Sequence, residues 1–197
     1  LMDLILEEKL SLKHKLTIFY DICKAVKYCH DNNVVHLDLK PENVLIKYNQ
    51  DKYNIRLADF GNSCIVDKDG KVLTAIGTLQ YNAPEVINEH PDGIDGKKAD
   101  IWSLGILFHV LLTNSWPISS IPGIDIIDIL SCGRISISES LSIDHQSFLY
   151  HLLKIDPEYR PSIHEVLEKL DSMNYDTPHQ IPRVSKVDKS NFIMRKW

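Results

Sequence analysis

The sequence has few glycines and few cysteines, and each shortage excludes a class of site. Only eight of the 197 residues are glycine, and the first is Gly61. A glycine-rich phosphate loop ahead of that position is excluded, because such a loop needs glycine where the backbone approaches the phosphates. The four cysteines form no Cys-x-x-Cys pair and no Cys/His spacing typical of a metal site. We therefore predict reduced thiols in a cytoplasmic or nuclear protein.

Positive charge and long apolar runs are also scarce. The formal net charge is −5, which argues against the basic surface of a nucleic-acid-binding protein. The longest uncharged stretch, 101–124, is interrupted by polar residues and prolines, and its apolar part is shorter than the roughly 20 residues of a membrane span. We expect a soluble protein with no nucleic-acid and no membrane partner. Positive charge is concentrated near the C-terminus, where we predict a basic tail over 173–197.

The hydrophobic pattern predicts one mainly α domain with a small β-hairpin. Two β-like runs, Val44–Ile46 and Ile55–Ala58, flank a polar stretch and predict the hairpin. Residues 59–85 are predicted to form a long irregular loop, of a length that compact domains keep for function. Helical spacing predicts helices near 1–8, 15–30, 100–113, 123–131, 145–154 and 162–172. The helix over 100–113 is apolar on nearly all sides, so we place it at the centre of the domain.

Chemistry-bearing residues concentrate around the predicted hairpin. Taken singly, each would more readily be explained as a turn or cap residue, whereas their joint order and spacing favours one shared site. The motifs, in chain order, are His36-Leu-Asp-Leu-Lys-Pro-Glu-Asn43, Asp59-Phe-Gly61, Gly77-Thr-x-x-Tyr81, Ala83-Pro-Glu85, Asp100-Ile-Trp-Ser-Leu-Gly105 and Asp156-Pro-x-x-Arg-Pro161.

These six ordered motifs resemble the signature set of the eukaryotic serine/threonine protein kinases. The resemblance covers residues 1–172 and corresponds to the C-terminal lobe, with a catalytic loop at 36–43 and an activation segment at 59–85. It implies a protein substrate, with ATP and Mg²⁺ as cofactors. The intact family is α+β overall, and the N-terminal lobe with its glycine-rich loop and strand lysine is expected to be absent from this chain.

Four residues suit phosphoryl transfer, in which the protein mainly positions groups and neutralises charge. Asp38 would accept or orient the proton of a substrate hydroxyl. Lys40, two residues further in an extended loop, would point to the same side and screen the γ-phosphate. Asn43 and Asp59 supply oxygen ligands suited to Mg²⁺. The hairpin would hold these two metal ligands at a fixed separation.

The resemblance adds two residues to the candidate site. Thr78 would bridge Asp38 and Lys40, as it does in the family, and it joins the catalytic set. From its apolar side chain alone we interpret Leu45 as a packing residue. The resemblance instead places Leu45 beneath an adenine ring.

Five other motif residues are predicted to serve structure. We expect His36 to be a packed, hydrogen-bonded histidine that stacks on Phe60. Glu85 and Arg160 are expected to form a buried ion pair at the end of the loop. Asp100 is expected to hold the backbone of the catalytic loop.

The chain departs from the family pattern at Leu37, where many kinases carry arginine. That arginine normally pairs with a phosphate on the activation segment. Thr74 occupies the register of the usual phosphorylation site, so we predict that its phosphorylation changes activity only weakly. The His-Leu-Asp sequence resembles the myosin light chain and death-associated kinases.

Two functional hypotheses remain. In the first, the chain is the catalytic lobe of a serine/threonine kinase whose upstream part is missing, which a first residue of Leu1 supports. Another kinase, or an N-lobe supplied elsewhere, would then be a partner. In the second, the chain is a non-catalytic kinase-like module that binds or decoys another kinase or its substrate. A metal-dependent hydrolase explains neither the long loop nor the pairing of Arg160.

Overall fold

The computed structural model describes residues 1–7, 10–49, 52–66, 71–73, 77–88, 91–118 and 124–173. The described part is mainly helical, as predicted, with three two-stranded antiparallel sheets. The α-helices are α1 (Met2–Leu6), α2 (Leu12–Asp31), α3 (Pro84–Ile87), α4 (Gly96–Thr113), α5 (Ile126–Ser131), α6 (Ile143–Leu152) and α7 (Ile163–Ser172). The strands are β1 (Val34–Val35), β2 (Val44–Asn49), β3 (Lys52–Leu57), β4 (Cys64–Ile65), β5 (Lys71–Val72) and β6 (Ile94–Asp95). Short 3-10 turns are η1 (Pro41–Asn43), η2 (Phe60–Asn62), η3 (Leu79–Tyr81) and η4 (Pro157–Tyr159).

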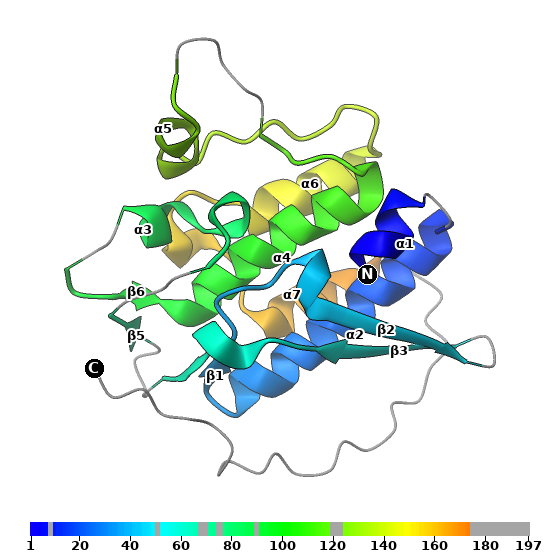
Figure 1. Cartoon of the computed structure of the whole chain (residues 1–197). Helices are drawn as coiled ribbons and strands as arrows, with labels where there is room; N and C mark the ends of the chain where they lie inside the picture. Colours follow the sequence, from blue (N-terminus) through cyan, green and yellow to red (C-terminus); the bar gives the residue numbers. More distant parts are fainter. Residues whose placement is uncertain are drawn as a thin grey trace.

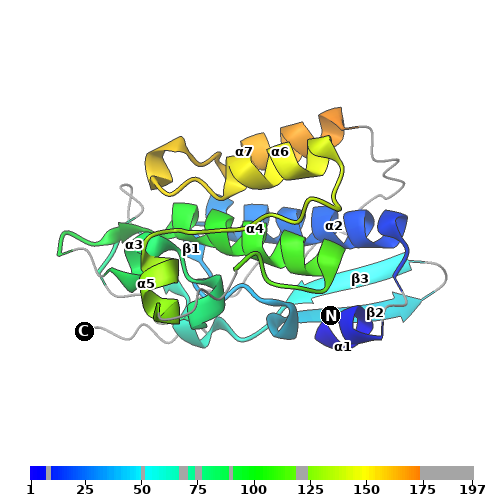
Figure 2. The ribbon, with the colours of Figure 1, turned by 90° about the horizontal axis from the view of Figure 1, so that it is seen from above.

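Helix α4 lies at the centre of the domain, as its nearly all-apolar sequence predicts. Figure 2 shows α6 and α7 in one layer, α2 and α4 in the next, and the β2–β3 hairpin with α1 beyond them. Phe108 of α4 stacks on Phe19 of α2 with ring centroids 4.2 Å apart, and it meets Phe148 of α6 edge to face. Burying three phenylalanine rings at one crossing removes a large apolar area from water, so this cluster is a main source of stability.

Side-chain caps explain where the long helices begin. Ser11 accepts a hydrogen bond from His14 N at 3.3 Å, so α2 starts three residues before the apolar periodicity does. Asp95 caps α4 in the same way through Lys98 N at 3.0 Å. The predicted start at Asp100 was therefore one turn too late.

The hairpin is present, but its strands are longer than predicted. Its register runs from Val44 opposite Leu57 to Asn49 opposite Lys52, so most of the expected polar connection is strand. The period-2 pattern hides this, because the outward-facing positions of a half-buried hairpin are polar. Figure 1 shows the hairpin lying across α2.

The activation segment is less irregular than predicted in its described part. Strand β4 pairs with β1, and β5 pairs with β6 at the start of α4. Thr74 lies outside the described residues, as does the tail from 174 onward. All four cysteines are free thiols. None of the helices in the described ranges combines the length and apolarity that a membrane crossing needs.

Candidate active site

Asp100 anchors the loop that carries Asp38. Its side chain is only 1% exposed, and its carboxylate accepts hydrogen bonds from His36 N at 2.9 Å and Leu37 N at 2.8 Å. The His30 Nε2 atom lies 2.9 Å from the same carboxylate. A buried carboxylate is tolerated only with such partners, so Asp100 fixes the loop backbone directly before Asp38, as the sequence predicts.

Leu37 adopts a backbone conformation that leucine rarely takes. Its φ is +62°, in the left-handed region, and its side chain is buried in the core. The two hydrogen bonds to Asp100 and the burial of the side chain hold this conformation. A Cβ atom at Gly77 would lie 2.5 Å from Leu37 O, so the activation segment approaches this carbonyl more closely than any side chain allows. Leu37 is therefore part of the core.

Four donors surround the Asp38 carboxylate, which is 6% exposed. Thr78 donates to Asp38 Oδ1 through its hydroxyl at 2.7 Å and its amide at 3.0 Å. Lys40 Nζ at 3.0 Å and Asn43 Nδ2 at 3.1 Å donate to Asp38 Oδ2. Lys40 Nζ also donates to Thr78 Oγ1 at 2.6 Å. The structure thus brings together the four residues predicted as catalytic: Asp38, Lys40, Asn43 and Thr78.

The same donors keep Asp38 ionised. Burial is the largest single influence and would raise its pKa, but the hydrogen bonds from Thr78 and Lys40 and the charge of Lys40 together outweigh it. The pKa of Asp38 is therefore lowered from the ordinary value. A carboxylate held in this state orients a hydroxyl well and is a weak base.

The hairpin connects Asn43 to Asp59. Asn43 directly precedes β2, and its carbonyl accepts a hydrogen bond from Ala58 N at 2.9 Å, one residue before Asp59. Asp59 is exposed, and its backbone has a left-handed conformation with φ +57°. Its side chain accepts a hydrogen bond from Gly61 N at 3.3 Å. The two candidate metal ligands therefore leave the hairpin at the same end.

The donor set at this end fits Mg²⁺. The Asn43 amide nitrogen is used by Asp38, which leaves the amide oxygen for a cation. Among the described residues no group of three or more His, Cys, Asp or Glu side chains forms a metal cage. Mg²⁺ is commonly bound through only one or two protein oxygens together with water and substrate phosphates. One amide oxygen and one exposed carboxylate match that requirement.

Leu45 does not pack in the core, so the interpretation from its apolar character alone was wrong. It is 56% exposed on β2, while its neighbour Val44 is fully buried. Alternation along a strand places one residue inward and the next outward, and Leu45 is on the outward side. An exposed leucine near Asn43 leaves an apolar surface free for a ligand.

Comparison with known proteins agrees with this geometry. The sequence model described as "Protein kinase domain" matches residues 1–170. The chain belongs to this family. A Drosophila melanogaster relative, the ovarian-specific serine/threonine-protein kinase Lok, is 37% identical over 176 residues, covering 86% of the chain and 37% of the relative.

Two further relatives are protein kinases. The CBL-interacting protein kinase 10 of Oryza sativa is 33% identical and covers 93% of the chain and 40% of the relative. The carbon catabolite-derepressing protein kinase of Candida glabrata is 32% identical, and the match covers 97% of the chain and 31% of the relative. The chain therefore spans well under half the length of these relatives.

The predicted structural contacts of the kinase domain are also present. Arg160 binds Glu85 through two hydrogen bonds of 2.6 and 2.8 Å, and its guanidinium lies 5.0 Å from the Trp102 ring centroid. The His36 ring contacts the Phe60 ring with centroids 4.8 Å apart, but the two planes are tilted by 54°, so the contact is present without the predicted stacking. The bidentate pair ties the end of the activation segment to the segment before α7.

Sequence reasoning missed three contributors to the loop. His30, at the end of α2, reaches the buried Asp100. Ser63 Oγ donates to His36 O at 3.1 Å, and Ala58 O accepts from His36 Nε2 at 3.0 Å. The signal that marks His30 in the sequence is its position in the last turn of a helix whose other inward residues are apolar. A polar residue on a buried face needs a partner.

Proposed function

We propose that this chain is the C-terminal lobe of a serine/threonine protein kinase and transfers the γ-phosphate of ATP to serine and threonine hydroxyls of protein substrates. The observation that carries the proposal is the Asp38 carboxylate, held by hydrogen bonds from Lys40, Asn43 and Thr78. Phosphoryl transfer asks the protein for positioning and charge neutralisation, and this cluster offers both.

Asp38 would orient the substrate hydroxyl. A carboxylate has about four acceptor positions, and four donors already occupy them. An incoming hydroxyl therefore takes the place of one donor. The Thr78 hydroxyl is the one that can turn away, because its amide still holds Asp38 Oδ1.

Lys40 would neutralise charge on the transferred phosphate. Its ammonium lies within 3.0 Å of both Asp38 Oδ2 and Thr78 Oγ1 and is half-buried. A cation fixed beside the acceptor oxygen stabilises negative charge where it develops. The same contact keeps Asp38 ionised, so Lys40 serves both reactants.

ATP and Mg²⁺ would bind at the open end of the hairpin. Asn43 and Asp59 would hold the metal, and Lys40 would contact the phosphates. Bound Mg²⁺ neutralises phosphate charge. Leu45 would lie against the adenine ring, because its exposed side chain offers an apolar surface on β2.

A non-catalytic module is the second candidate, and one observation favours it. Leu45 and Asp59 are both exposed, so the described residues do not enclose a nucleotide from above. If nothing covers this face, the same surface would instead serve as a docking site for another kinase or its substrate.

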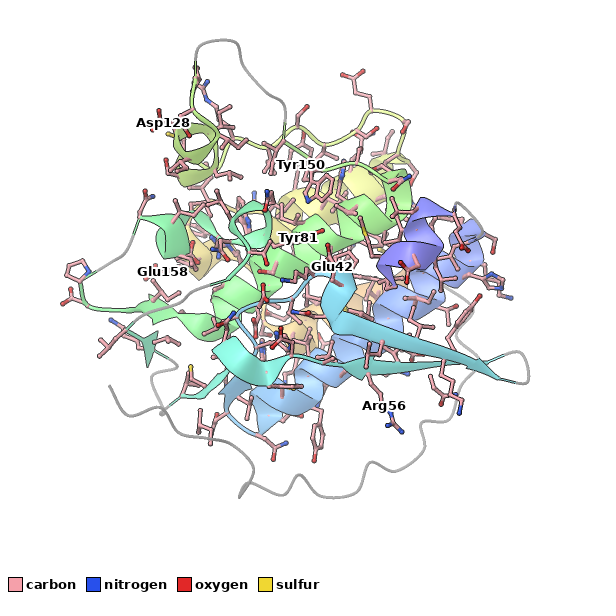
Figure 3. All side chains as sticks on the ribbon, in the orientation of Figure 1. Glu42, Arg56, Tyr81, Asp128, Tyr150 and Glu158 are labelled. Atoms are coloured by element: carbon pink, nitrogen blue, oxygen red, sulfur yellow. The ribbon has the colours of Figure 1, made fainter. Side chains whose placement is uncertain are left out.

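Phosphate transfer from γ-labelled ATP with Mg²⁺ tests the proposal. We expect labelling of a serine- and threonine-containing protein substrate by the chain, and loss of about 10³-fold in rate in Asp38→Asn. Asp128→Asn is the matched control, because Asp128 lies on α5, away from the hairpin residue Arg56 (Figure 3). Equal labelling by Asp38→Asn and Asp128→Asn contradicts catalysis by Asp38 and favours the non-catalytic module.

A further inference from the structure

His109, near the C-terminal end of α4, is a buried histidine outside the candidate active site. Its side chain is 1% exposed, and both ring nitrogens contact the backbone of other segments. Nδ1 lies 2.8 Å from Ser115 O, in the loop that follows α4, and Nε2 lies 3.1 Å from Ser138 N, between α5 and α6. One imidazole ring therefore joins the central helix to two segments of the surface.

The two backbone partners fix the protonation state of this ring. A backbone N–H can only donate and a carbonyl can only accept, so Nδ1 carries the proton and Nε2 accepts from Ser138 N. Thr113 Oγ1, 3.2 Å from Nδ1, is a hydroxyl that suits either form of the ring. A second proton on Nε2 would point at the Ser138 N–H and break that hydrogen bond. The arrangement therefore requires a neutral His109.

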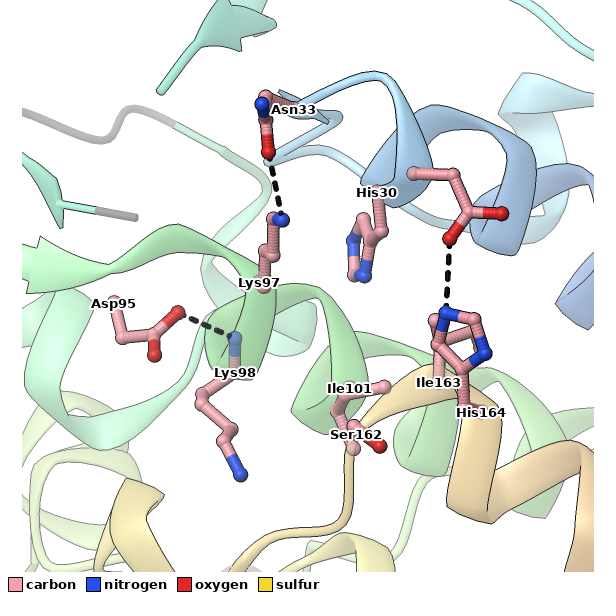
Figure 4. Close-up of a pocket in the computed structure, with 10 residues that line it drawn as sticks. His30, Asn33, Asp95, Lys97, Lys98, Ile101, Ser162, Ile163 and His164 are labelled. Carbon is pink, nitrogen blue, oxygen red and sulfur yellow. Dashed lines mark hydrogen bonds and ion pairs between the residues drawn. The ribbon is translucent and has the colours of Figure 1, made fainter. Parts of the chain in front are cut away.

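The two histidines labelled in Figure 4 have partners that tolerate a charged ring. His164 Nε2 lies 2.8 Å from an oxygen of the Asp31 carboxylate, and His30 Nε2 lies 2.9 Å from an oxygen of the Asp100 carboxylate. A carboxylate accepts a hydrogen bond from a neutral and from a charged imidazole, and the charged one binds it more strongly. Protonation would preserve these two contacts, whereas it would break one contact of His109.

The surroundings of His109 also favour the neutral ring. The titratable or charged groups on the elements around it are Lys15 on α2, Tyr81 on η3, Glu139 beside Ser138, and Asp144 and His145 on α6. Lys15 Nζ donates to Leu112 O at 3.0 Å, which brings a positive charge to this end of α4. Glu139 and Asp144 are exposed, so water screens their charge. Burial lowers the pKa of His109 from the ordinary value, and the hydrogen bond with Ser115 O opposes this shift without reversing it.

We propose that His109 is a pH-sensitive contact that holds the segment 135–138 against α4 in its neutral form and releases it on protonation. The added proton goes to Nε2, and the lost bond is the hydrogen bond from Ser138 N. The hydrogen bond from Nδ1 to Ser115 O survives, because a charged ring still donates there. The proposal does not depend on the proposed kinase activity.

The segment that His109 holds is connected to the end of the activation segment. Ser136 N donates to Pro117 O at 2.7 Å, so the segment 135–138 is bonded to the loop that carries Trp116. The Trp116 ring meets the Tyr81 ring edge to face with centroids 6.4 Å apart. Tyr81 lies in η3, directly after Thr78 of the candidate active site. We therefore expect the surroundings of Trp116 to change when the Ser138 contact is lost.

NMR of the unchanged 197-residue chain tests the proposal from about pH 8 to about pH 5. Nitrogen shifts of labelled histidine should show the proton of His109 on Nδ1 at the upper end. On acidification, the protection of the Ser138 amide against hydrogen exchange should fall at least about tenfold. The midpoint should match that of the His109 ring and lie below the ordinary 6.5. The indole N–H signal of Trp116 should move with the same midpoint.

His109→Gln identifies the signals of this ring and removes its titration. In this variant we expect no pH step in the protection of Ser138. His14→Gln is the matched control, because it removes an exposed histidine of α2, and it should keep the step. The readouts are specific to single residues because His36 and His145 are also buried. If His109→Gln melts early, the measurements on the unchanged chain decide alone.

Three results would overturn the pH-sensitive contact. They are a proton on Nε2 of His109 near pH 8, a Ser138 amide whose protection does not follow the ring, and a ring that stays neutral until the whole chain unfolds. A Trp116 signal that does not move with the His109 midpoint overturns the connection to the activation segment.

Discussion

The two halves of the candidate active site differ in how much of their geometry the chain itself supplies. Asp38 is buried, and its carboxylate accepts four hydrogen bonds from Thr78, Lys40 and Asn43. Asp59 is exposed and accepts a hydrogen bond from Gly61 at 3.3 Å. The half proposed to orient the substrate hydroxyl is therefore preorganised, whereas the half proposed for Mg²⁺ and ATP depends more on what binds there. Preorganised groups need little rearrangement when charge develops, and at Asp38 only the Thr78 hydroxyl would have to turn away.

The largest loss of stability is expected at Asp100, the buried carboxylate that holds the loop in front of Asp38. Asp100→Ala leaves the donors of His30, His36 and Leu37 without their acceptor, and we expect a loss of about 4 kcal/mol in the free energy of unfolding. Urea unfolding followed by circular dichroism measures it. Asp128→Ala is the control, because Asp128 is an exposed residue of α5. Equal losses in the two variants would mean that Asp100 does not hold the loop.

Two glycine-to-alanine substitutions compare how tightly the two halves of the site are packed. Gly77→Ala places a Cβ atom 2.5 Å from Leu37 O, a backbone atom that cannot move aside, and should cost about 2 kcal/mol of stability. Gly61→Ala meets only Asp59 Oδ1 at 3.1 Å, on an exposed side chain, and should cost about 0.5 kcal/mol. Thermal unfolding compares them. The reverse order would show the metal half to be the tightly packed one.

Thr78→Val tests the buried half through the pH dependence of the unfolding free energy. It removes one donor to Asp38 while keeping the volume, and should cost about 1.5 kcal/mol near neutral pH. The lowered pKa of Asp38 in the folded chain stabilises the fold above the ordinary value of 3.8 and is lost as the pH falls through the folded value. The difference between the variant and the unchanged chain should therefore shrink on acidification. Urea titrations across this range measure it, and a constant difference argues against an ionised Asp38.

The smallest effect on stability is expected at Leu45. Leu45→Ala should change the unfolding free energy by less than about 0.5 kcal/mol because the side chain is mostly exposed, whereas Val44→Ala next to it should cost about 2 kcal/mol. Mg²⁺–ATP affinity should fall about fivefold in Leu45→Ala, measured by calorimetric titration. Unchanged affinity removes Leu45 from the proposed nucleotide surface.

Local signals predicted the long helices and the motifs well, and missed what depends on caps and alternation. The start of α4 needed the Asp95 cap, and the extent of β2 and β3 was hidden by polar outward-facing residues. Leu45 was misjudged because the apolar character of a residue does not say which side of a strand it occupies. Its role beneath an adenine ring stays a prediction.

Residue types and their order were enough to assign the family, to predict a helical domain with a hairpin and to select Asp38, Lys40, Asn43 and Asp59, because helix periodicity and short motifs are properties of neighbouring residues. The tertiary structure alone decided which of these groups is buried, which is exposed and which shares a partner. Asp38 meets Thr78 across 40 residues, and His30 meets Asp100 across 70. Contacts of this kind depend on how the helices pack around α4, so no local pattern contains them.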